Sequence, residues 1–135
     1  MTRSGGRIGL ANWTPEGFIG ELFRVVGGFV AAPPGTRSPA LWGSEPYIVE
    51  LFGPQAADLR CVRRHFNFRY RSAGHWIEVF RSFYGPTHKA FGVLDAVRQL
   101  QLSAAMADLL GRWNVAGANS LVVPGEYLEI VITKA

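Results

Sequence analysis

The sequence predicts an α/β fold that combines three strands with about five helices. Three observations lead to this fold class. Residues 6–13 form a short apolar run with no helical period, and a helix-start signature follows at once. Residues 59–70 alternate apolar and polar side chains with the period of a strand. Residues 121–133 are rich in Val, Ile and Leu, which favours a final strand, and helical spacing fills most of the chain between these segments.

The first predicted segment, residues 6–30, is a strand that leads directly into a helix. Thr14 is expected to cap the helix, Pro15 suits its first position, and Glu16 favours its positive end. A continuous apolar strand that feeds a helix is typical of a parallel sheet covered on both faces. We therefore expect an interior strand that needs neighbouring strands on both sides.

A helical insert is predicted at residues 36–53. It starts with a proline-rich connection that carries Trp42. A short helix is then expected to begin at Ser44 and to end at Gly53-Pro54.

The strand predicted at residues 59–70 carries much of the chain's positive charge, in a protein of net charge +4 and pI near 9.7. We assign its even positions to a buried face (Val62, Phe66, Phe68, Tyr70) and its odd positions to a polar face (Cys61, Arg63, His65, Asn67, Arg69). Solvated strand arginines, which also protect an edge strand from edge-to-edge pairing, explain the cluster. Since no recognisable nucleic-acid-binding signature accompanies it, we expect no nucleic-acid partner.

Helical spacing dominates residues 72–114. Ser72 is expected to cap a helix, and Gly85-Pro86 to break or kink it. A further helix is expected to begin at about Ala96 or Ser103, followed by a turn region over residues 114–119. The final strand is expected to be interrupted at Pro124-Gly125 by a bulge or bend.

The composition, 135 residues of which 48% are hydrophobic, fits one compact domain or half-domain. No apolar stretch approaches the roughly 20 residues that a membrane-spanning helix needs, and we expect no membrane partner and no signal peptide. The single cysteine, Cys61, excludes an intrachain disulfide and predicts a cytoplasmic protein with an inert structural thiol. No metal-ligand spacing is present, so no metal is expected.

Several stretches of the chain together resemble one known family. They are GGRIGLANWTPEGFIG at residues 5–20, SPALWG at 38–43, FNFRYRS at 66–72, HW at 75–76, FYGPT at 83–87 and SLVVPGEYLE at 120–129. In this order they resemble the C-terminal half of class I S-adenosylmethionine-dependent methyltransferases, and most closely the bacterial small-molecule branch related to the ubiquinone and menaquinone methylases. The resemblance covers nearly the whole chain but not the half of the family that carries the cofactor.

The resemblance implies that residues 1–135 form a single partial domain, the end of a Rossmann-like sheet. Its three strands would be one parallel-type strand and an antiparallel closing pair, with the C-terminal strand between the other two. The family's cofactor is S-adenosylmethionine, held by a glycine-rich turn and by an acidic residue that ends the second strand. Neither feature exists in this chain, so we expect it to bind no cofactor alone.

The resemblance also suggests residues that line the site of a small, apolar or aromatic acceptor. Trp13 and Thr14 would lie at the carboxyl edge of the sheet, and the other candidates come from the helical segments: Trp42, His75, Trp76, Phe80 and Tyr84. His75 and His88 are candidate general bases, although no carboxylate partner is visible for either. Glu126 is expected to pair with Arg69 or to order backbone amides. Aromatic residues at helical spacing are also explained by core packing, and no catalytic residue is assigned.

Two classes of function follow. The chain is either the substrate-side part of a methyltransferase, completed by a cofactor-binding half, or a non-catalytic remnant. In the first case it is a truncated gene product or one chain of a split enzyme. In the second it binds a small apolar ligand or associates with itself as a homodimer through the surface that the missing half would cover.

Overall fold

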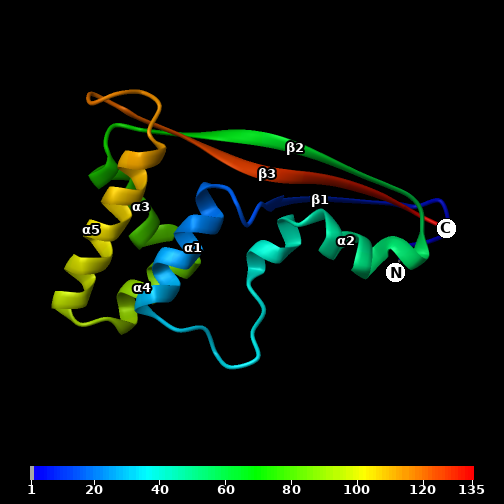
Figure 1. Cartoon of the computed structure of the whole chain (residues 1–135), viewed down its shortest axis with the longest axis horizontal. Helices are drawn as coiled ribbons and strands as arrows, with labels where there is room; N and C mark the ends of the chain where they lie inside the picture. Colours follow the sequence, from blue (N-terminus) through cyan, green and yellow to red (C-terminus); the bar gives the residue numbers. More distant parts are fainter. Residues whose placement is uncertain (1) are drawn as a thin grey trace. The chain divides into compact units, whose positions relative to one another are not determined.

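The computed structural model describes residues 2–135, and it is an α/β structure with three strands and five α-helices (Figure 1). In chain order these are β1 (Arg7–Trp13), α1 (Phe18–Phe29), α2 (Glu45–Phe52), β2 (Ala56–Tyr70), α3 (Ala73–Phe83), α4 (Gly85–Val93), α5 (Ala96–Trp113) and β3 (Leu121–Lys134). Two short 3-10 helices, η1 (Pro39–Gly43) and η2 (Gly53–Gln55), flank α2. The residues divide into two compact units, the first made of residues 2–20, 37–66 and 125–135 and the second of residues 21–36 and 67–124.

The three strands form one antiparallel sheet in the order β1-β3-β2 (Figure 1). β1 pairs with β3 in a register that runs from Arg7 opposite Thr133 to Trp13 opposite Tyr127. The prediction that the C-terminal strand lies between the other two is confirmed. β1, expected to be a parallel-type strand, pairs here with an antiparallel neighbour, and the strands of residues 2–135 contain no parallel pair.

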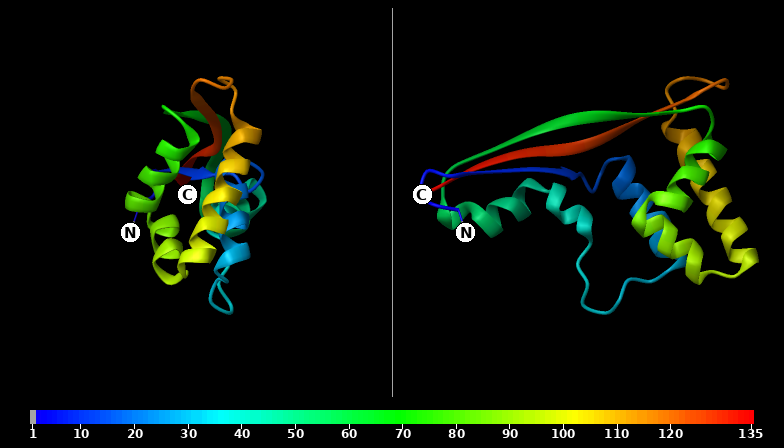
Figure 2. Two further views of the ribbon diagram at one scale, coloured as in Figure 1. Left: turned by 90° about the vertical axis from the view of Figure 1, so that its left-hand side faces the viewer. Right: turned by 180° about the vertical axis from the view of Figure 1, so that it is seen from behind.

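The core of the first unit lies between α2 and one face of the sheet. Ile48 of α2 packs against alternate residues of β3, namely Leu128, Ile130 and Ile132, because residues two apart on a strand share a face. Figure 2 shows α2 running beside the strands. Partly buried side chains surround this cluster: Ile8, Leu10, Phe52, Ala56, Leu59 and Cys61.

The predicted faces of β2 were partly wrong. Phe68 is buried as expected, but Phe66 is 53% exposed, and Cys61 packs against the core from the face assigned as polar. The cause is that α2 covers the odd-numbered side of this part of β2, which the local alternation alone did not reveal. Burial raises the pKa of the Cys61 thiol, and Glu45 raises it further, so the thiol stays protonated and unreactive.

Three predicted boundaries also differ from the structure. α1 begins at Phe18, because Thr14 does not cap it but bonds to β3. β2 begins at Ala56 rather than at residue 59. β3 continues through Pro124-Gly125 without interruption. Pro124 precedes the residues of β3 that pair with β1. At Pro124, therefore, β3 has a neighbouring strand on one side only, and proline is tolerated at such an edge.

The second unit is mainly helical, with α3 packed against α4 and α5 (Figure 2). Ser72 caps α3 as predicted, its hydroxyl accepting a hydrogen bond of 3.1 Å from the amide of His75. The predicted break is also confirmed, because α3 ends at Phe83 and α4 begins at Gly85. The buried side chains of this unit include Leu22, Phe68, Trp76, Phe80, Phe91, Leu102, Met106, Leu109, Leu110 and Val123.

A single side chain organises the turn that leads from α5 to β3. The amide nitrogen of Asn114 donates to the carbonyls of Gly117 (2.8 Å) and Ser120 (2.9 Å). Its oxygen accepts from the amides of Ala116 and Val122, both at 3.0 Å. Gly117 has a φ of 79°, a conformation that favours glycine.

Within residues 2–135, no helix has the length and the apolar character that crossing a membrane requires.

Gly43 allows η1 to lie against β1, and we expect Gly43→Ala to destabilise the protein. An added Cβ would collide with the carbonyl oxygen and carbon of Trp13, which are backbone atoms that cannot rotate away. Overpacking of this kind lowers the free energy of unfolding by about 1–3 kcal/mol, measurable by urea denaturation. Gly27→Ala in α1 is the matched control: nothing lies within 4 Å of the added methyl group, so stability should be unchanged or rise by about 0.5–1 kcal/mol. Equal stability of Gly43→Ala and the parent protein would contradict the prediction.

Candidate functional site

A carboxylate joins all three strands of the first unit at the end of β1. The hydroxyl of Thr14, which is fully buried, donates to Oε1 of Glu126 at 2.9 Å. Arg63 Nη1 on β2 donates to the same oxygen at 2.6 Å, and the amide of Thr14 donates to the backbone carbonyl of Glu126 at 3.1 Å. The turn after β1 is therefore tied to β3 directly and to β2 through the carboxylate. We call Thr14, Arg63 and Glu126 the strand clamp.

The strand clamp carries one negative and at least one positive charge. His65 Nε2 lies 3.8 Å from Oε2 of Glu126, and Oε2 of Glu16 lies 3.9 Å from Nη1 of Arg63. Burial raises the pKa of Glu126, but the hydrogen bonds from Thr14 and Arg63 and the nearby positive charge of Arg63 and His65 outweigh this, so the pKa lies below its ordinary value. Glu126 is thus an ionised acceptor and not a proton donor near neutral pH.

Gly17 makes room for the strand clamp. A Cβ at this position would lie 2.8 Å from the Thr14 hydroxyl oxygen and 3.2 Å from Cβ of Glu126. Residues 14–17, where the sequence predicted the start of a helix, therefore form a tight turn that brings Thr14 next to β3.

On the other face of the sheet, three aromatic rings surround an open hollow of about 350 Å³. Trp13 meets Phe66 edge-on with ring centroids 6.5 Å apart, and it meets Tyr127 edge-on at 6.1 Å. Ala11 completes the lining. Each ring comes from a different strand, because Trp13 and Tyr127 are opposite each other in the β1–β3 register and Phe66 belongs to β2. We call this feature the aromatic hollow.

The residue before Trp13 carries an unsatisfied donor. The side-chain nitrogen Nδ2 of Asn12 is buried and has no hydrogen-bond partner among the described residues. A buried donor without a partner is destabilising by about 1–3 kcal/mol, and most buried polar atoms in proteins do have one. Asn12 lies opposite Leu128 in the β1–β3 register, so its side chain is on the face of the sheet that α2 covers and not on the face of the aromatic hollow.

The predicted site residues of the second unit form a separate cluster. Trp76 and Phe80 stack with ring centroids 3.6 Å apart, and Phe80 lies 4.7 Å from the ring of Tyr84. His75 meets Tyr70 edge-on at 5.4 Å, and its Nδ1 is buried without a hydrogen-bond partner among the described residues. Burial raises the pKa of the Tyr84 hydroxyl, which therefore stays protonated. The structure thus brings His75, Trp76, Phe80 and Tyr84 into one unit and mostly into its interior.

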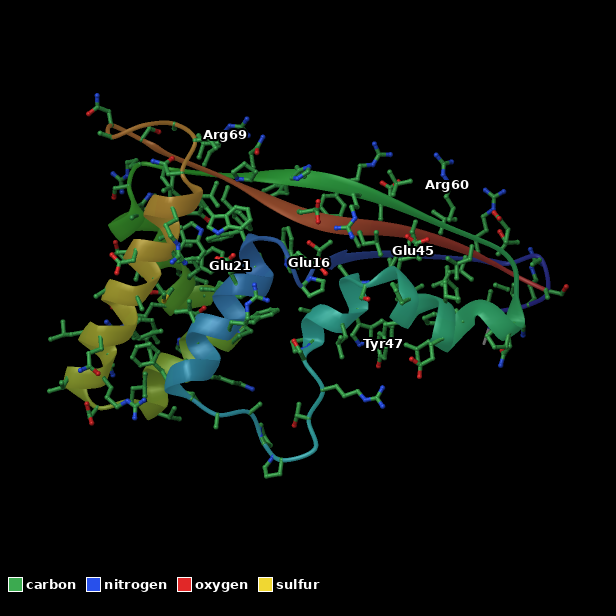
Figure 3. All side chains as sticks on the ribbon, in the orientation of Figure 1. Glu16, Glu21, Glu45, Tyr47, Arg60 and Arg69 are labelled. Atoms are coloured by element: carbon green, nitrogen blue, oxygen red, sulfur yellow. The ribbon has the colours of Figure 1, made fainter. Side chains whose placement is uncertain are left out.

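Trp42 and Glu126 have partners that the sequence did not predict. Trp42, in η1, is 39% exposed and packs against Tyr47 and Phe52 of α2 with ring centroids 6.0 and 6.2 Å apart. Glu126 pairs with Arg63, so the expected pairing with Arg69 was wrong. In Figure 3, Arg60 and Arg69 extend away from β2, as solvated arginines do.

Arg63, Phe66 and Tyr127 belong to this site, although the sequence did not predict them as parts of it. Phe66 was assigned to the buried face and Arg63 to solvent. A usable signal did exist, since Trp13, Phe66 and Tyr127 are aromatic residues, one in each predicted strand. Only the register, however, brings these residues together.

Glu126→Gln should reduce stability in a pH-dependent way. The pKa of Glu126 is lower in the folded protein than in the unfolded chain. Its carboxylate therefore contributes fully to the free energy of unfolding above the pKa of the unfolded chain, and this contribution is lost as pH falls through the pKa of the folded protein. We expect Glu126→Gln to lower the free energy of unfolding by about 1–2 kcal/mol at pH 7, with the difference from the parent protein shrinking below about pH 4. Urea denaturation at several pH values measures this.

Glu129→Gln is the matched control, because Glu129 lies on the same strand and pairs with Arg64 at 3.2 Å in a more exposed position. Its effect should stay below about 0.5 kcal/mol. A Glu126→Gln effect that is the same at pH 3 and pH 7 would show that the charge of Glu126 does not contribute.

Comparisons with known proteins identify relatives but no family. No family model matches the chain. The uncharacterized protein Rv1403c of Mycobacterium tuberculosis is 35% identical over 93 residues, which are 67% of this chain and 34% of that protein. The uncharacterized protein Rv1405c of the same organism is 29% identical over 138 aligned residues, 99% of this chain and 49% of that protein, and Mycobacterium bovis has a counterpart, Mb1440c, with the same values. The chain thus spans between about one third and one half of the length of the curated relatives it matches.

Proposed function

We propose that this chain is the C-terminal, substrate-side part of an S-adenosylmethionine-dependent methyltransferase that acts on a small apolar or aromatic acceptor. In this proposal the chain is inactive until a cofactor-binding half completes it. The observation that carries the proposal is the strand order, in which the last strand of the chain lies between the first two and antiparallel to the first. The resemblance described above implies the same order for the last three strands of the family's sheet.

The edge of β1 supports the need for a second half. β1 is hydrogen-bonded to β3 on one side and ends the strand order on the other. Alternate residues of β1 face the core, so this short strand is partly buried while one row of its backbone groups has no strand partner within residues 2–135. An edge of this kind readily accepts another strand. The relatives are two to three times longer than the stretch they share with this chain, which leaves them room for such a segment.

The residues of this chain do not fit S-adenosylmethionine by themselves. The strand-to-helix turn at the end of β1 uses the amide of Thr14 for Glu126, so that amide is not available to a ligand. The glycines with positive φ among the described residues are Gly5, Gly35 and Gly117, and none of them lies between a strand and a following helix. We therefore propose that the cofactor is bound by the other half.

The contribution of this chain to methyl transfer would be positioning. Transfer of a methyl group needs the acceptor atom, the methyl carbon and the sulfur in line, and holding reactants in that geometry supplies a large part of a rate enhancement. The aromatic hollow offers an apolar surface for the acceptor. The strand clamp holds the turn that follows Trp13 in one conformation.

Cofactor binding tests the proposal directly. We expect calorimetry to detect saturable binding of S-adenosylmethionine to full-length Rv1405c, with a Kd below about 100 µM, which corresponds to roughly 5–6 kcal/mol. The 135-residue chain should show no saturable binding up to millimolar cofactor. If the folded relative binds no S-adenosylmethionine, the methyltransferase assignment is wrong. If the chain alone binds it stoichiometrically, the requirement for a second half is wrong.

A non-catalytic protein that binds a small apolar ligand is the second candidate, and the aromatic hollow favours it. Ligand-observed NMR with 2-naphthol, a planar aromatic probe, should detect binding to the chain alone. Phe66→Ser should weaken this binding at least ten-fold, because Phe66 supplies one wall of the hollow. Phe83→Ser removes an aromatic ring that is 84% exposed elsewhere and should have no effect. Equal weakening by both variants would indicate non-specific adsorption.

A further inference from the structure

A second hollow, of about 310 Å³, lies in the helical unit, and a fixed arginine is part of its wall. Its lining comes from three consecutive helices: Arg81 and Ser82 of α3, His88, Phe91 and Gly92 of α4, and Gln99 of α5. None of these residues belongs to the aromatic hollow or to the strand clamp. We call this feature the Arg81 hollow.

The orientation of Gln99 fixes the arginine. The side-chain nitrogen of Gln99 donates to the carbonyls of Phe91 (2.8 Å) and Leu94 (2.9 Å), which end α4. Both amide hydrogens are thereby used, and the side-chain oxygen must face the other way. That oxygen accepts a hydrogen bond of 2.8 Å from Arg81 Nη2. The guanidinium group is thus held by a residue that is itself fully hydrogen-bonded.

Two further contacts restrict Arg81. Its guanidinium carbon lies 4.8 Å from the centre of the Phe91 ring, which is buried and gives the cation a rigid floor. Its backbone carbonyl accepts a hydrogen bond of 2.9 Å from His88 Nδ1. A carbonyl oxygen can only accept, so Nδ1 of His88 carries a hydrogen. Arginine side chains on protein surfaces are normally flexible, but this one is preorganised.

The positive charge of Arg81 has no acidic partner within residues 2–135. No carboxylate in this part of the chain lies within 4.0 Å of Arg81, whereas Arg63, Arg64 and Arg112 each have at least one carboxylate partner. The Gln99 oxygen is neutral and satisfies one of the five guanidinium hydrogens. The Arg81 hollow therefore combines an oriented, uncompensated cation with the hydroxyl of Ser82 and the ring of His88.

From these observations we propose that the Arg81 hollow binds the oxyanion of a small ligand, a carboxylate or a phosphate group. A planar guanidinium group offers two parallel N–H donors that match the two oxygens of either group. Ser82 also lines the hollow, and its hydroxyl is a potential donor to a bound oxygen. This site is independent of the methyltransferase proposal, because it lies on other residues and requires no cofactor.

Titration of the 15N-labelled chain with sodium phosphate and, separately, with sodium benzoate tests the proposal. Ionic strength is held constant with sodium chloride, so that general screening does not change. We expect saturable shifts of the backbone amides of Ser82, His88 and Gln99 with a Kd near about 1 mM, a value typical of weak single-site binding. The tighter of the two probes identifies the preferred oxyanion.

Three variants distinguish specific binding at the Arg81 hollow from non-specific attraction of anions by the positive charge of the protein. Arg81→Gln should weaken binding of both probes at least ten-fold. Arg81→Lys should weaken the binding of benzoate more than that of phosphate, because lysine keeps the positive charge but cannot form the bidentate hydrogen bonds of a guanidinium group. Ser82→Asp leaves every contact of Arg81 in place and adds a competing carboxylate at an exposed position, so it should also weaken binding at least ten-fold.

Arg69→Gln is the matched control, since it removes the same charge from an exposed position on β2 outside the hollow. Its Kd values should stay within two-fold of those of the parent chain. Equal weakening by Arg69→Gln and Arg81→Gln would overturn the proposal, as would shifts that do not saturate or that spare Ser82, His88 and Gln99. Because Ser82→Asp keeps Arg81 itself in the chain, it decides the matter even if Arg81→Gln unfolds the protein.

Discussion

The central strand β3 is the constraint on which the rest of the structure depends, because β1 and β2 are each its neighbours and not each other's. Its alternate residues supply Leu128, Ile130 and Ile132 to the core under α2. Further toward its start, Leu121 and Val123 are buried in the helical unit. Between these stretches lies Glu126, whose carboxylate reaches both of the other strands of the first unit. The same strand therefore supplies the hydrophobic residues of the core and positions the carboxylate that pairs with Arg63.

The parts of the fold that depend on neighbouring residues could be predicted from the sequence, and the parts that depend on distant ones could not. Ser72 and Gly85-Pro86 marked the ends of helices correctly, since a cap or a break acts within one turn. Thr14 has the same local chemistry as Ser72, but its hydroxyl bonds to a residue 112 positions away and the helix starts later. The choice of Arg63 over Arg69 as partner of Glu126 was likewise a matter of strand register, which no local pattern specifies.

The two charged clusters differ in a way that separates a structural role from a binding role. In the strand clamp, carboxylate and guanidinium satisfy each other, and the pKa of Glu126 is lowered accordingly. A balanced pair of this kind holds strands together and has little left to offer a ligand. In the Arg81 hollow, neutral groups hold the cation in place and leave its charge uncompensated. Rigid support without neutralisation is the arrangement expected where a charged partner is to be received.

The ends of the described chain meet each other across the sheet. The amide of Gly5 donates to the carbonyl of Lys134 at 3.0 Å, and the amide of Lys134 donates to the carbonyl of Gly6 at 2.9 Å. Adjacent ends of this kind make a fold tolerant of circular permutation, because a short bridging peptide can replace the break without disturbing the strands. New ends could then be opened in the 31–36 loop, which lies between α1 and η1 and belongs to neither strand. A continuous β3–β1 hairpin made in this way would turn the most distant pairing in the chain into a local one and should speed its formation.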